Sequence, residues 1–158
     1  MSKVLITGGT GLIGSRLSGL LKAKGYEVII LTRNNNFKSS HDSFHWNIEE
    51  YRLDDSAFKN IDHILHLAGA GVADKRWSTK RKKEILTSRV VSTNLLYDTI
   101  KRLKIPLKSF IAASAIGYYG STTTDKIFIE TDQPYNDFLG NVCKLWERAI
   151  HQFENLKI

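Results

Sequence analysis

The sequence contains little cysteine and no long hydrophobic run, and each shortage excludes a class of protein. Cys143 is the only cysteine, which excludes a disulfide framework and favours a reducing compartment. No apolar run approaches the length that crosses a membrane, and no apolar stretch of signal-peptide type follows Lys3. We therefore expect a cytoplasmic protein without a membrane partner. Internal repeats and low-complexity tracts are also missing, which favours an ordinary globular domain.

Acidic residues are outnumbered, so the formal net charge is +7. Much of this charge comes from six residues in one segment: Lys75, Arg76, Lys80, Arg81, Lys82 and Lys83. We interpret this segment as a solvated face. Attraction for an anionic substrate or for nucleic acid is the alternative. Nucleic acid is disfavoured, because only Trp77 offers an aromatic ring beside the cluster and no nucleic-acid motif accompanies it.

Hydrophobic patterning predicts strands that alternate with helices, and 158 residues suffice for one domain with its own core. The predicted strands are Lys3–Thr7, Glu27–Thr32, Phe44–Asn47, Asp62–Leu67 and Leu107–Ala113. The predicted helices are Leu12–Lys24, Ser78–Leu103 and Phe138–Phe153, and a polar loop is predicted at Asn34–Ser43. This alternation predicts right-handed crossovers and a parallel sheet covered by helices on both faces.

The stretch VLITGGTGLIGSRL (Val4–Leu17) places glycines between the first strand and the first helix. Gly8 allows a tight turn, Gly11 lets the backbone approach a pyrophosphate, and Gly14 lets the helix pack against the strand. The N-terminus of the helix offers free N–H groups and a positive dipole end to an anion. This context predicts the phosphate-binding loop of a Rossmann-like, doubly wound α/β fold with strand order 3-2-1-4-5.

The residues after the second predicted strand bear on the choice of nucleotide. A carboxylate there would accept a hydrogen bond from the adenosine ribose of NAD, but the chain has Thr32, Arg33 and Asn34. A guanidinium suits a 2′-phosphate, so NADP(H) is favoured over NAD(H). The alternative is that Arg33 is a solvated loop residue.

Four motifs occur in the order typical of one superfamily: TGGTGLIG (Thr7–Gly14), HLAGAG (His66–Gly71), RVVSTNLL (Arg89–Leu96) and SAIGYYG (Ser114–Gly120). The chain resembles the extended short-chain dehydrogenases/reductases over essentially its whole length. It is most similar to a sugar-nucleotide epimerase-like subgroup, once labelled cell-division inhibitors, through DKRW (Asp74–Trp77), GYYG and the C-x-x-W-E helix. The loop, the Arg33 position and the resemblance together predict these cofactor-binding residues: Gly8, Thr10, Gly11, Leu12, Ile13, Gly14, Thr32, Arg33, Leu67, Ala68, Gly69 and Arg89.

The catalytic motif of the superfamily is missing. Alignment on Glu147 places Leu139 and Cys143 where the family has its Tyr-x-x-x-Lys pair, and neither can move a proton as tyrosine does or supply a cation as lysine does. The resemblance places Ser114 at the substrate-binding serine. The candidate catalytic residues are therefore Ser114, Tyr118 and Cys143, and no metal site is predicted.

The roles of two tyrosines and of the cysteine have alternative interpretations. Tyr118 is either an acid or base or an aromatic contact, whereas Tyr119 is favoured as a contact. Cys143 lies on an apolar helical stripe and is favoured as a small buried side chain, although we expect it to line the cofactor pocket.

Arg89 interrupts the apolar stripe of the long second helix, at a position where the family motif has asparagine. A buried cation needs a partner, because its desolvation is costly. Two interpretations have equal weight: a salt bridge, for example with Glu147, or an ion pair with cofactor phosphates or an anionic substrate.

Extended family members continue past the last predicted helix into a substrate-binding lobe. We therefore expect residues 1–158 to be an NAD(P)-binding Rossmann domain that lacks this lobe and is inactive alone. The full-length form would transfer a hydride to or from a small substrate, nominally a sugar nucleotide. The alternative is a non-catalytic NADP(H)-binding module that senses redox state or docks a partner. Family analogy also permits a homodimer.

Overall fold

A six-stranded sheet forms the centre of the computed structural model, which describes residues 1–34 and 41–158. The strands are β1 (Lys3–Thr7), β2 (Glu27–Thr32), β3 (Asp42–Asn47), β4 (Arg52–Leu53), β5 (His63–His66) and β6 (Ser109–Ala112). Their order is β4-β3-β2-β1-β5-β6, in which β4 pairs antiparallel with β3 and the other pairs are parallel. Apart from β4, a short edge strand that we did not predict, this is the order 3-2-1-4-5. The predicted Rossmann-like α/β fold is confirmed.

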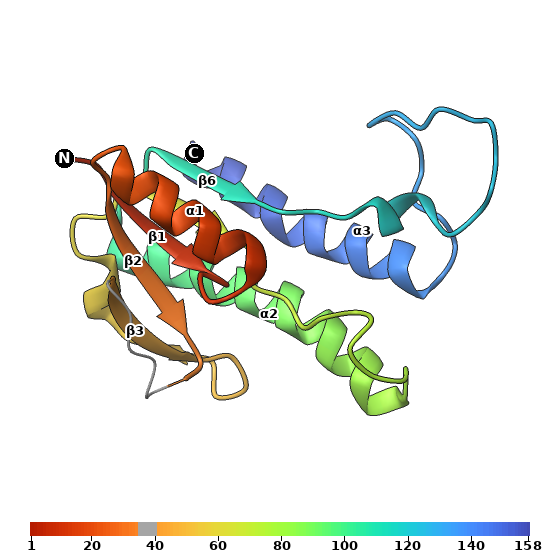
Figure 1. The fold of residues 1–158 in the computed structure, drawn as a ribbon, viewed down its shortest axis with the longest axis horizontal. Helices are drawn as coiled ribbons and strands as arrows, with labels where there is room; N and C mark the ends of the chain where they lie inside the picture. The colour runs from red at the N-terminus through yellow and green to blue at the C-terminus, as the bar shows by residue number, and fades with distance from the viewer. Residues whose placement is uncertain (35–40) are drawn as a thin grey trace.

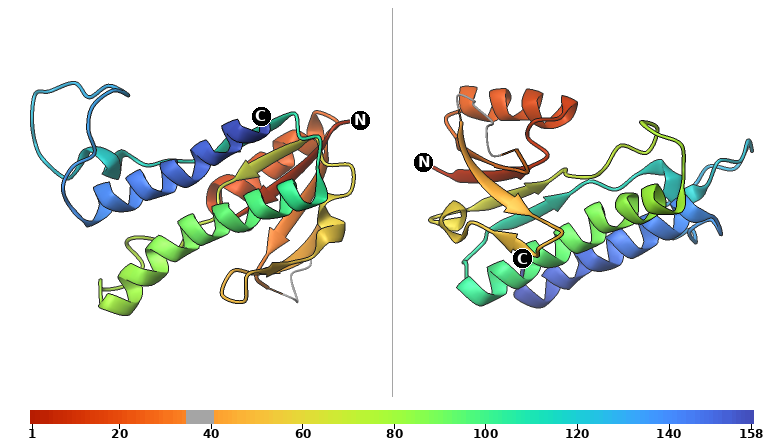
Figure 2. Two further views of the ribbon diagram at one scale, coloured as in Figure 1. Left: turned by 180° about the vertical axis from the view of Figure 1, so that it is seen from behind. Right: turned by 90° about the horizontal axis from the view of Figure 1, so that it is seen from below.

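Three α-helices cover the sheet from opposite sides. They are α1 (Leu12–Ala23), α2 (Thr79–Leu103) and α3 (Phe138–His151), and three 3-10 helices accompany them: η1 (Asp55–Phe58), η2 (Ile116–Tyr119) and η3 (Gln152–Leu156). Figures 1 and 2 show α1 on one face and the longer α2 and α3 side by side on the other. No helix among the described residues combines the length and the apolar character needed to span a membrane.

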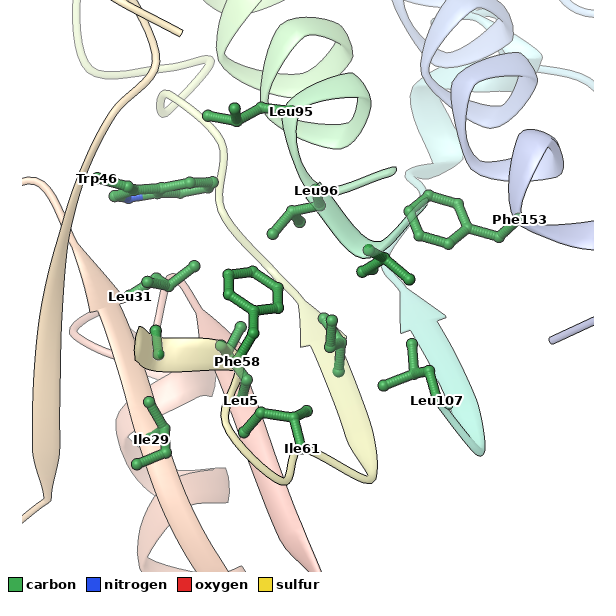
Figure 3. Packing of buried hydrophobic residues seen from close by; sticks show 13 residues of the cluster. Leu5, Ile29, Leu31, Trp46, Phe58, Ile61, Leu95, Leu96, Leu107 and Phe153 are labelled. Atoms are coloured by element: carbon green, nitrogen blue, oxygen red, sulfur yellow. The ribbon is translucent and has the colours of Figure 1, made fainter. Parts of the chain in front are cut away.

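The strands are apolar on both faces, as expected for a covered parallel sheet. Toward α2 and α3 the sheet presents Leu5, Ile29, Leu31 and Ile64, which pack with Trp46, Phe58, Leu96 and Phe153 in the larger core (Figure 3). Toward α1 it presents Val4, Ile6, Val28 and Ile30. The alternation along each strand therefore divides the core into two layers.

Element boundaries differ from the predicted ones by a few residues, each for a local reason. The Ser78 hydroxyl accepts a hydrogen bond from the Arg81 N–H, so Ser78 caps α2 rather than opening it. Lys104 has a left-handed φ of 51°, which ends α2 before Pro106. Residues 35–40 of the predicted polar loop lie outside the described residues, and β3 already begins at Asp42.

The carboxyl ends of three strands meet at one edge of the sheet. Thr7 of β1 is paired with Leu31 of β2 and with His66 of β5. The loop after β1 leads directly into α1, so the N-terminus of that helix lies at the same edge. Ligands of open α/β sheets bind at this place, where connections leave toward opposite faces.

Candidate functional site

Two glycines of the loop after β1 are required by the fold itself. Gly8 has a φ of 71°, and a Cβ atom there would lie 2.8 Å from the carbonyl carbon and oxygen of Leu67. A Cβ atom on Gly14 would overlap the Gly8 carbonyl oxygen and lie 2.7 Å from the Gly9 Cα. Side chains at these positions would separate α1 from the strand ends.

The third glycine of the loop, Gly11, is not required by the fold. Gly11 has φ −82° and ψ 176°, which any residue adopts, and an added Cβ atom would meet only the Gly8 carbonyl oxygen, at 3.3 Å. No side chain caps α1, and no acidic residue lies in its first turn. Glycine at position 11 therefore leaves backbone N–H groups accessible at the positive end of a helix, which suits a closely approaching phosphate.

A cavity of about 300 Å³ opens beside this loop. It is lined by predicted residues: Gly8, Thr10, Gly11, Thr32, Arg33, Leu67, Ala68 and Gly69. It is also lined by residues that we did not predict: Leu31, Asn34, Trp46, Ile48, Ala70 and Ser88. Of the other predicted residues, Leu12 and Ile13 are exposed, Gly14 packs against Gly8, and Arg89 lies behind Gly69. Arg33 is the one charged side chain among these lining residues.

The unpredicted lining residues come from neighbouring elements. Trp46 belongs to β3, whose carboxyl end adjoins that of β2, so strand order could have indicated it. Ser88 lies on α2, and nothing in the local sequence marks it. Its hydroxyl accepts a hydrogen bond from the Ala70 N–H at 2.9 Å and donates to the Ile85 carbonyl at 3.0 Å. Ser88 thus fixes the backbone that follows β5.

A buried polar chain holds the opposite side of the cavity. The Thr7 hydroxyl oxygen accepts hydrogen bonds from the N–H groups of Leu67 and Ala68, each at 3.2 Å, and lies 2.7 Å from Nδ1 of His66. Nε2 of His66 lies 3.0 Å from the Thr93 hydroxyl on α2. Burial lowers the pKa of His66 to about 4, so the ring is neutral at pH 7. Thr7 then donates to Nδ1, and Nε2–H donates to Thr93.

A second, smaller cavity of about 190 Å³ adjoins the first. The two share Arg33, Trp46, Ile48 and Ser88, and Glu49 and Glu84 line only the second. The hydrogen bond from Arg81 is the main cause that lowers the pKa of Glu84, and Arg33 adds a smaller electrostatic contribution. Arg33 therefore lies between both cavities and can reach a ligand group in either.

The predicted catalytic residues Ser114 and Tyr118 line a third cavity, of about 380 Å³. Tyr119, Glu130 and Glu147 line it as well. The Ser114 hydroxyl donates a hydrogen bond to the Glu147 carboxylate. The Tyr119 hydroxyl donates to the Ile129 carbonyl at 3.2 Å, whereas the Tyr118 hydroxyl bonds to none of the described residues. Tyr118 is thus the phenol whose proton is available.

Cys143 lies beside the third cavity, next to the lining residue Ala115, but does not line it. Its side chain is buried, and Sγ lies 3.8 Å from the Ala115 carbonyl oxygen. Burial is the main cause that raises the pKa of the thiol, with a further contribution from the Glu147 charge. Cys143 lines none of the three cavities, contrary to our expectation for the cofactor pocket. Its surroundings are those of a packed side chain rather than of a nucleophile.

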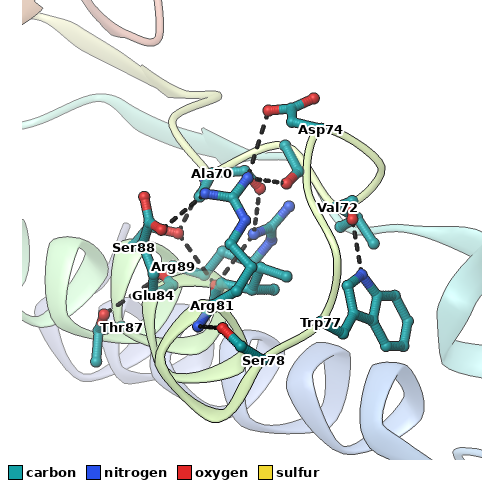
Figure 4. Close-up of polar contacts among 12 residues, drawn as sticks. Ala70, Val72, Asp74, Trp77, Ser78, Arg81, Glu84, Thr87, Ser88 and Arg89 are labelled. Carbon is teal, nitrogen blue, oxygen red and sulfur yellow. Dashed lines mark hydrogen bonds and ion pairs between the residues drawn. The ribbon is translucent and has the colours of Figure 1, made fainter.

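Two expectations about arginines need correction. Glu147 accepts from Ser114 and makes no salt bridge with Arg89, which instead donates to the carbonyls of Ala70 and Ile85. Arg81 does not belong to a solvated face, because only 6% of it is exposed. Its guanidinium donates to Glu84, Asp74 and the Gly71 carbonyl (Figure 4). The other five members of the basic segment are exposed, as predicted.

Comparison with known proteins places these features in a family. The model of the NAD-dependent epimerase/dehydratase family matches residues 4–140. An epimerase family protein from Mycobacterium leprae (strain TN) is 34% identical over 146 residues, which are 92% of this chain and 46% of that protein. The chain spans about half the length of the curated relatives it matches.

Solved structures agree with this assignment. The human epimerase family protein SDR39U1 (isoform 2), solved with NADPH, is 29% identical with a TM-score of 0.75, over 93% of this chain and 48% of that one. MoeE5, in complex with UDP-glucose and NAD, is 27% identical with a TM-score of 0.78, over 96% of this chain and 49% of that one. The chain therefore belongs to the NAD-dependent epimerase/dehydratase family.

Proposed function

We propose that residues 1–158 form the cofactor-binding domain of an epimerase-like oxidoreductase, and that this domain binds NADP(H) more tightly than NAD(H). Gly11 carries the proposal. The fold needs glycine at positions 8 and 14, but at position 11 glycine serves the approach of a ligand to the uncapped helix. The relative solved with NADPH and the one solved with NAD support a nicotinamide dinucleotide.

The preference for NADP(H) rests on Arg33. It is the one charged side chain of the first cavity, and no carboxylate lines that cavity to accept a ribose 2′-hydroxyl. A guanidinium makes charge-assisted hydrogen bonds to a 2′-phosphate. The dinucleotide phosphates would lie against Gly11 and the α1 N-terminus, and the adenosine half would lie beside Arg33.

When bound, the cofactor supplies hydride transfer. The residues of this chain that could handle the accompanying proton are Ser114 and Tyr118, which line the same cavity. The Ser114 hydroxyl donates its proton to the Glu147 carboxylate, so the serine oxygen can still accept a hydrogen bond. A small substrate is proposed, with sugar nucleotides as its class, because MoeE5 was solved with UDP-glucose.

The second candidate is a non-catalytic NADP(H)-binding module that senses redox state or docks a partner. The observation in its favour is that Leu139 and Cys143 stand in place of the Tyr-x-x-x-Lys pair, and that Cys143 is buried. The cytoplasmic location and the homodimer stay predictions.

Calorimetry with NADPH and NADH tests the proposal on the wild type, Arg33→Ala and the control Arg148→Ala. Arg148 is exposed on α3, away from the three cavities. Arg33→Ala should weaken NADPH binding roughly ten- to a hundredfold, the worth of charge-assisted hydrogen bonds, and leave NADH unchanged. Equal wild-type affinities for both dinucleotides would reject the preference, and binding of neither would reject the cofactor site.

A further inference from the structure

Arg89 is a cation whose charge no described carboxylate balances. It lies in the middle of α2 and is half-buried. Nη1 donates to the carbonyl oxygens of Ala70 and Ile85, both at 3.1 Å (Figure 4). The guanidinium also lies 5.2 Å from the ring centre of Trp146. Carbonyl dipoles and a ring face hold the group in place without neutralising it.

The guanidinium lies beside the backbone that lines the first cavity. A Cβ atom on Gly69 would be 3.0 Å from Cζ of Arg89 and 3.1 Å from Nη2. Gly69 lines the cavity, and so does Ser88, the neighbour of Arg89 on α2. Glycine at position 69 therefore lets the guanidinium lie against the backbone that a dinucleotide would contact.

The same guanidinium also lies close to Cys143. Trp146, whose ring makes the cation–π contact with Arg89, lies three residues after Cys143 on the same face of α3. Both side chains, Trp146 and Cys143, are buried. Cys143 stands where the family motif has lysine. Two departures from the motif, arginine for asparagine on α2 and cysteine for lysine on α3, thus meet at one place.

We propose that Arg89 replaces the family lysine as the cation that positions the nicotinamide ribose. The inference rests on the proposed dinucleotide binding. Nη2 donates to none of the described residues and lies against Gly69, so it is available for ribose hydroxyl oxygens. A guanidinium keeps its charge in this half-buried setting, which a displaced lysine would do less readily. Arg89 is therefore a positioning residue that comes from α2.

A series of four ligands of increasing length distinguishes contact of Arg89 with the nicotinamide ribose from contact with the pyrophosphate. Adenosine 2′,5′-bisphosphate and 2′-phospho-ADP lack the second ribose, whereas 2′-phospho-ADP-ribose and NADPH contain it. Arg89→Met should leave the affinity for the first two unchanged and weaken the last two roughly ten- to a hundredfold. Arg148→Met serves as the control and should change none of the four.

A second pair of variants tests the exchange of the cation between helices. Arg89→Asn should lose affinity for 2′-phospho-ADP-ribose, and Arg89→Asn with Cys143→Lys should recover most of it, because the pair restores the family arrangement. Melting curves and circular dichroism report whether each variant folds. If Arg89→Met does not fold, Arg89→Lys should show the same dependence on the second ribose at smaller size.

The outcomes are distinct. Loss that begins with 2′-phospho-ADP would assign Arg89 to the pyrophosphate and overturn the inference, as would unchanged affinity across the series or no recovery in the double variant. Failure of the wild type to bind any of the four ligands would reject the proposed cofactor site and this inference with it.

Discussion

The Thr7 hydroxyl lies 2.7 Å from Nδ1 of His66, inside a sheet whose other residues at this depth are mostly aliphatic. The contact joins β1 to β5 at the point where both strands end. It also holds the N–H groups of Leu67 and Ala68, which line the proposed cofactor cavity. The buried neutral histidine therefore orients Thr7, and Thr7 in turn holds the backbone against which a dinucleotide would lie.

Because His66 is buried and neutral, we expect the free energy of unfolding to depend on pH. Burial lowers the pKa of His66 from 6.5 to about 4 in the folded chain, while the unfolded chain keeps the ordinary value. Between these values the unfolded chain binds more protons, so the stability contributed by neutral His66 is complete above pH 6.5 and is lost as the pH falls toward 4. The loss should reach about 3 kcal/mol.

Urea unfolding of the wild type and His66→Gln at pH 7, 6, 5 and 4 measures this loss. The free energy of unfolding should fall more steeply with decreasing pH for the wild type, because the variant lacks the titrating ring. Other groups titrate in both proteins and cancel in the comparison. Parallel profiles for the two proteins would contradict a buried neutral His66.

The glycine loop predicts two opposite phenotypes. Gly11→Val should stay folded, at a cost of about 1 kcal/mol for valine at the N-cap, and lose dinucleotide binding, because its side chain would occupy the place of the phosphate. Gly14→Ala should destabilise the fold by about 1–3 kcal/mol, because its Cβ atom would overlap backbone atoms of Gly8 and Gly9. Thermal melting and calorimetry distinguish them. A stable Gly11 variant that binds NADPH normally would remove the main support for the cofactor site.

Gly19 serves as the matched comparison on the same helix. It lies inside α1, and an added Cβ atom would meet nothing within 4 Å. Gly19→Ala should therefore raise the stability by about 0.5–1 kcal/mol and leave ligand binding unchanged. A lower melting temperature would show that α1 makes contacts at this position that the structure lacks.

We expect the 158-residue chain to bind cofactor but to turn over no sugar nucleotide. The Tyr-x-x-x-Lys pair is replaced by Leu139 and Cys143, and general acid–base catalysis is typically worth a factor of ~10²–10⁴. Positioning of the substrate by further residues can be worth more. Assays of NADP(H)-dependent turnover on this chain, and on a longer form with a C-terminal lobe, should be compared across sugar nucleotides and small carbonyl compounds.

Comparison of the 158-residue chain with the longer form distinguishes the two causes of inactivity, the absent Tyr-x-x-x-Lys pair and the absent substrate contacts. Activity that appears only with the lobe would identify missing substrate contacts as the deficit. An inactive longer form with cofactor bound would favour the non-catalytic module. Robust turnover by the short chain would refute the prediction and would point to Ser114 and Tyr118 as a sufficient site.

The sequence by itself determined the features that depend on neighbouring residues. Strand, glycine loop and helix follow one another within Lys3–Ala23, so backbone preference and apolar periodicity were enough to predict the turn, the helix and the α/β class. The strand order was predicted with the Rossmann-like fold that this loop indicates, whose first strands follow the order 3-2-1-4-5.

Only the tertiary structure decided which distant side chains meet. Glu147 lies 33 residues from Ser114, and its contact with that serine, rather than with Arg89, depends on how α3 packs beside η2 and α2. The side chain of Arg89 packs against Trp146 on α3 and against Gly69 in the loop after β5. Periodicity tells which face of a helix is buried, but not which residues of other elements cover it. The partners of a buried charge are therefore set by the packing of whole elements against one another.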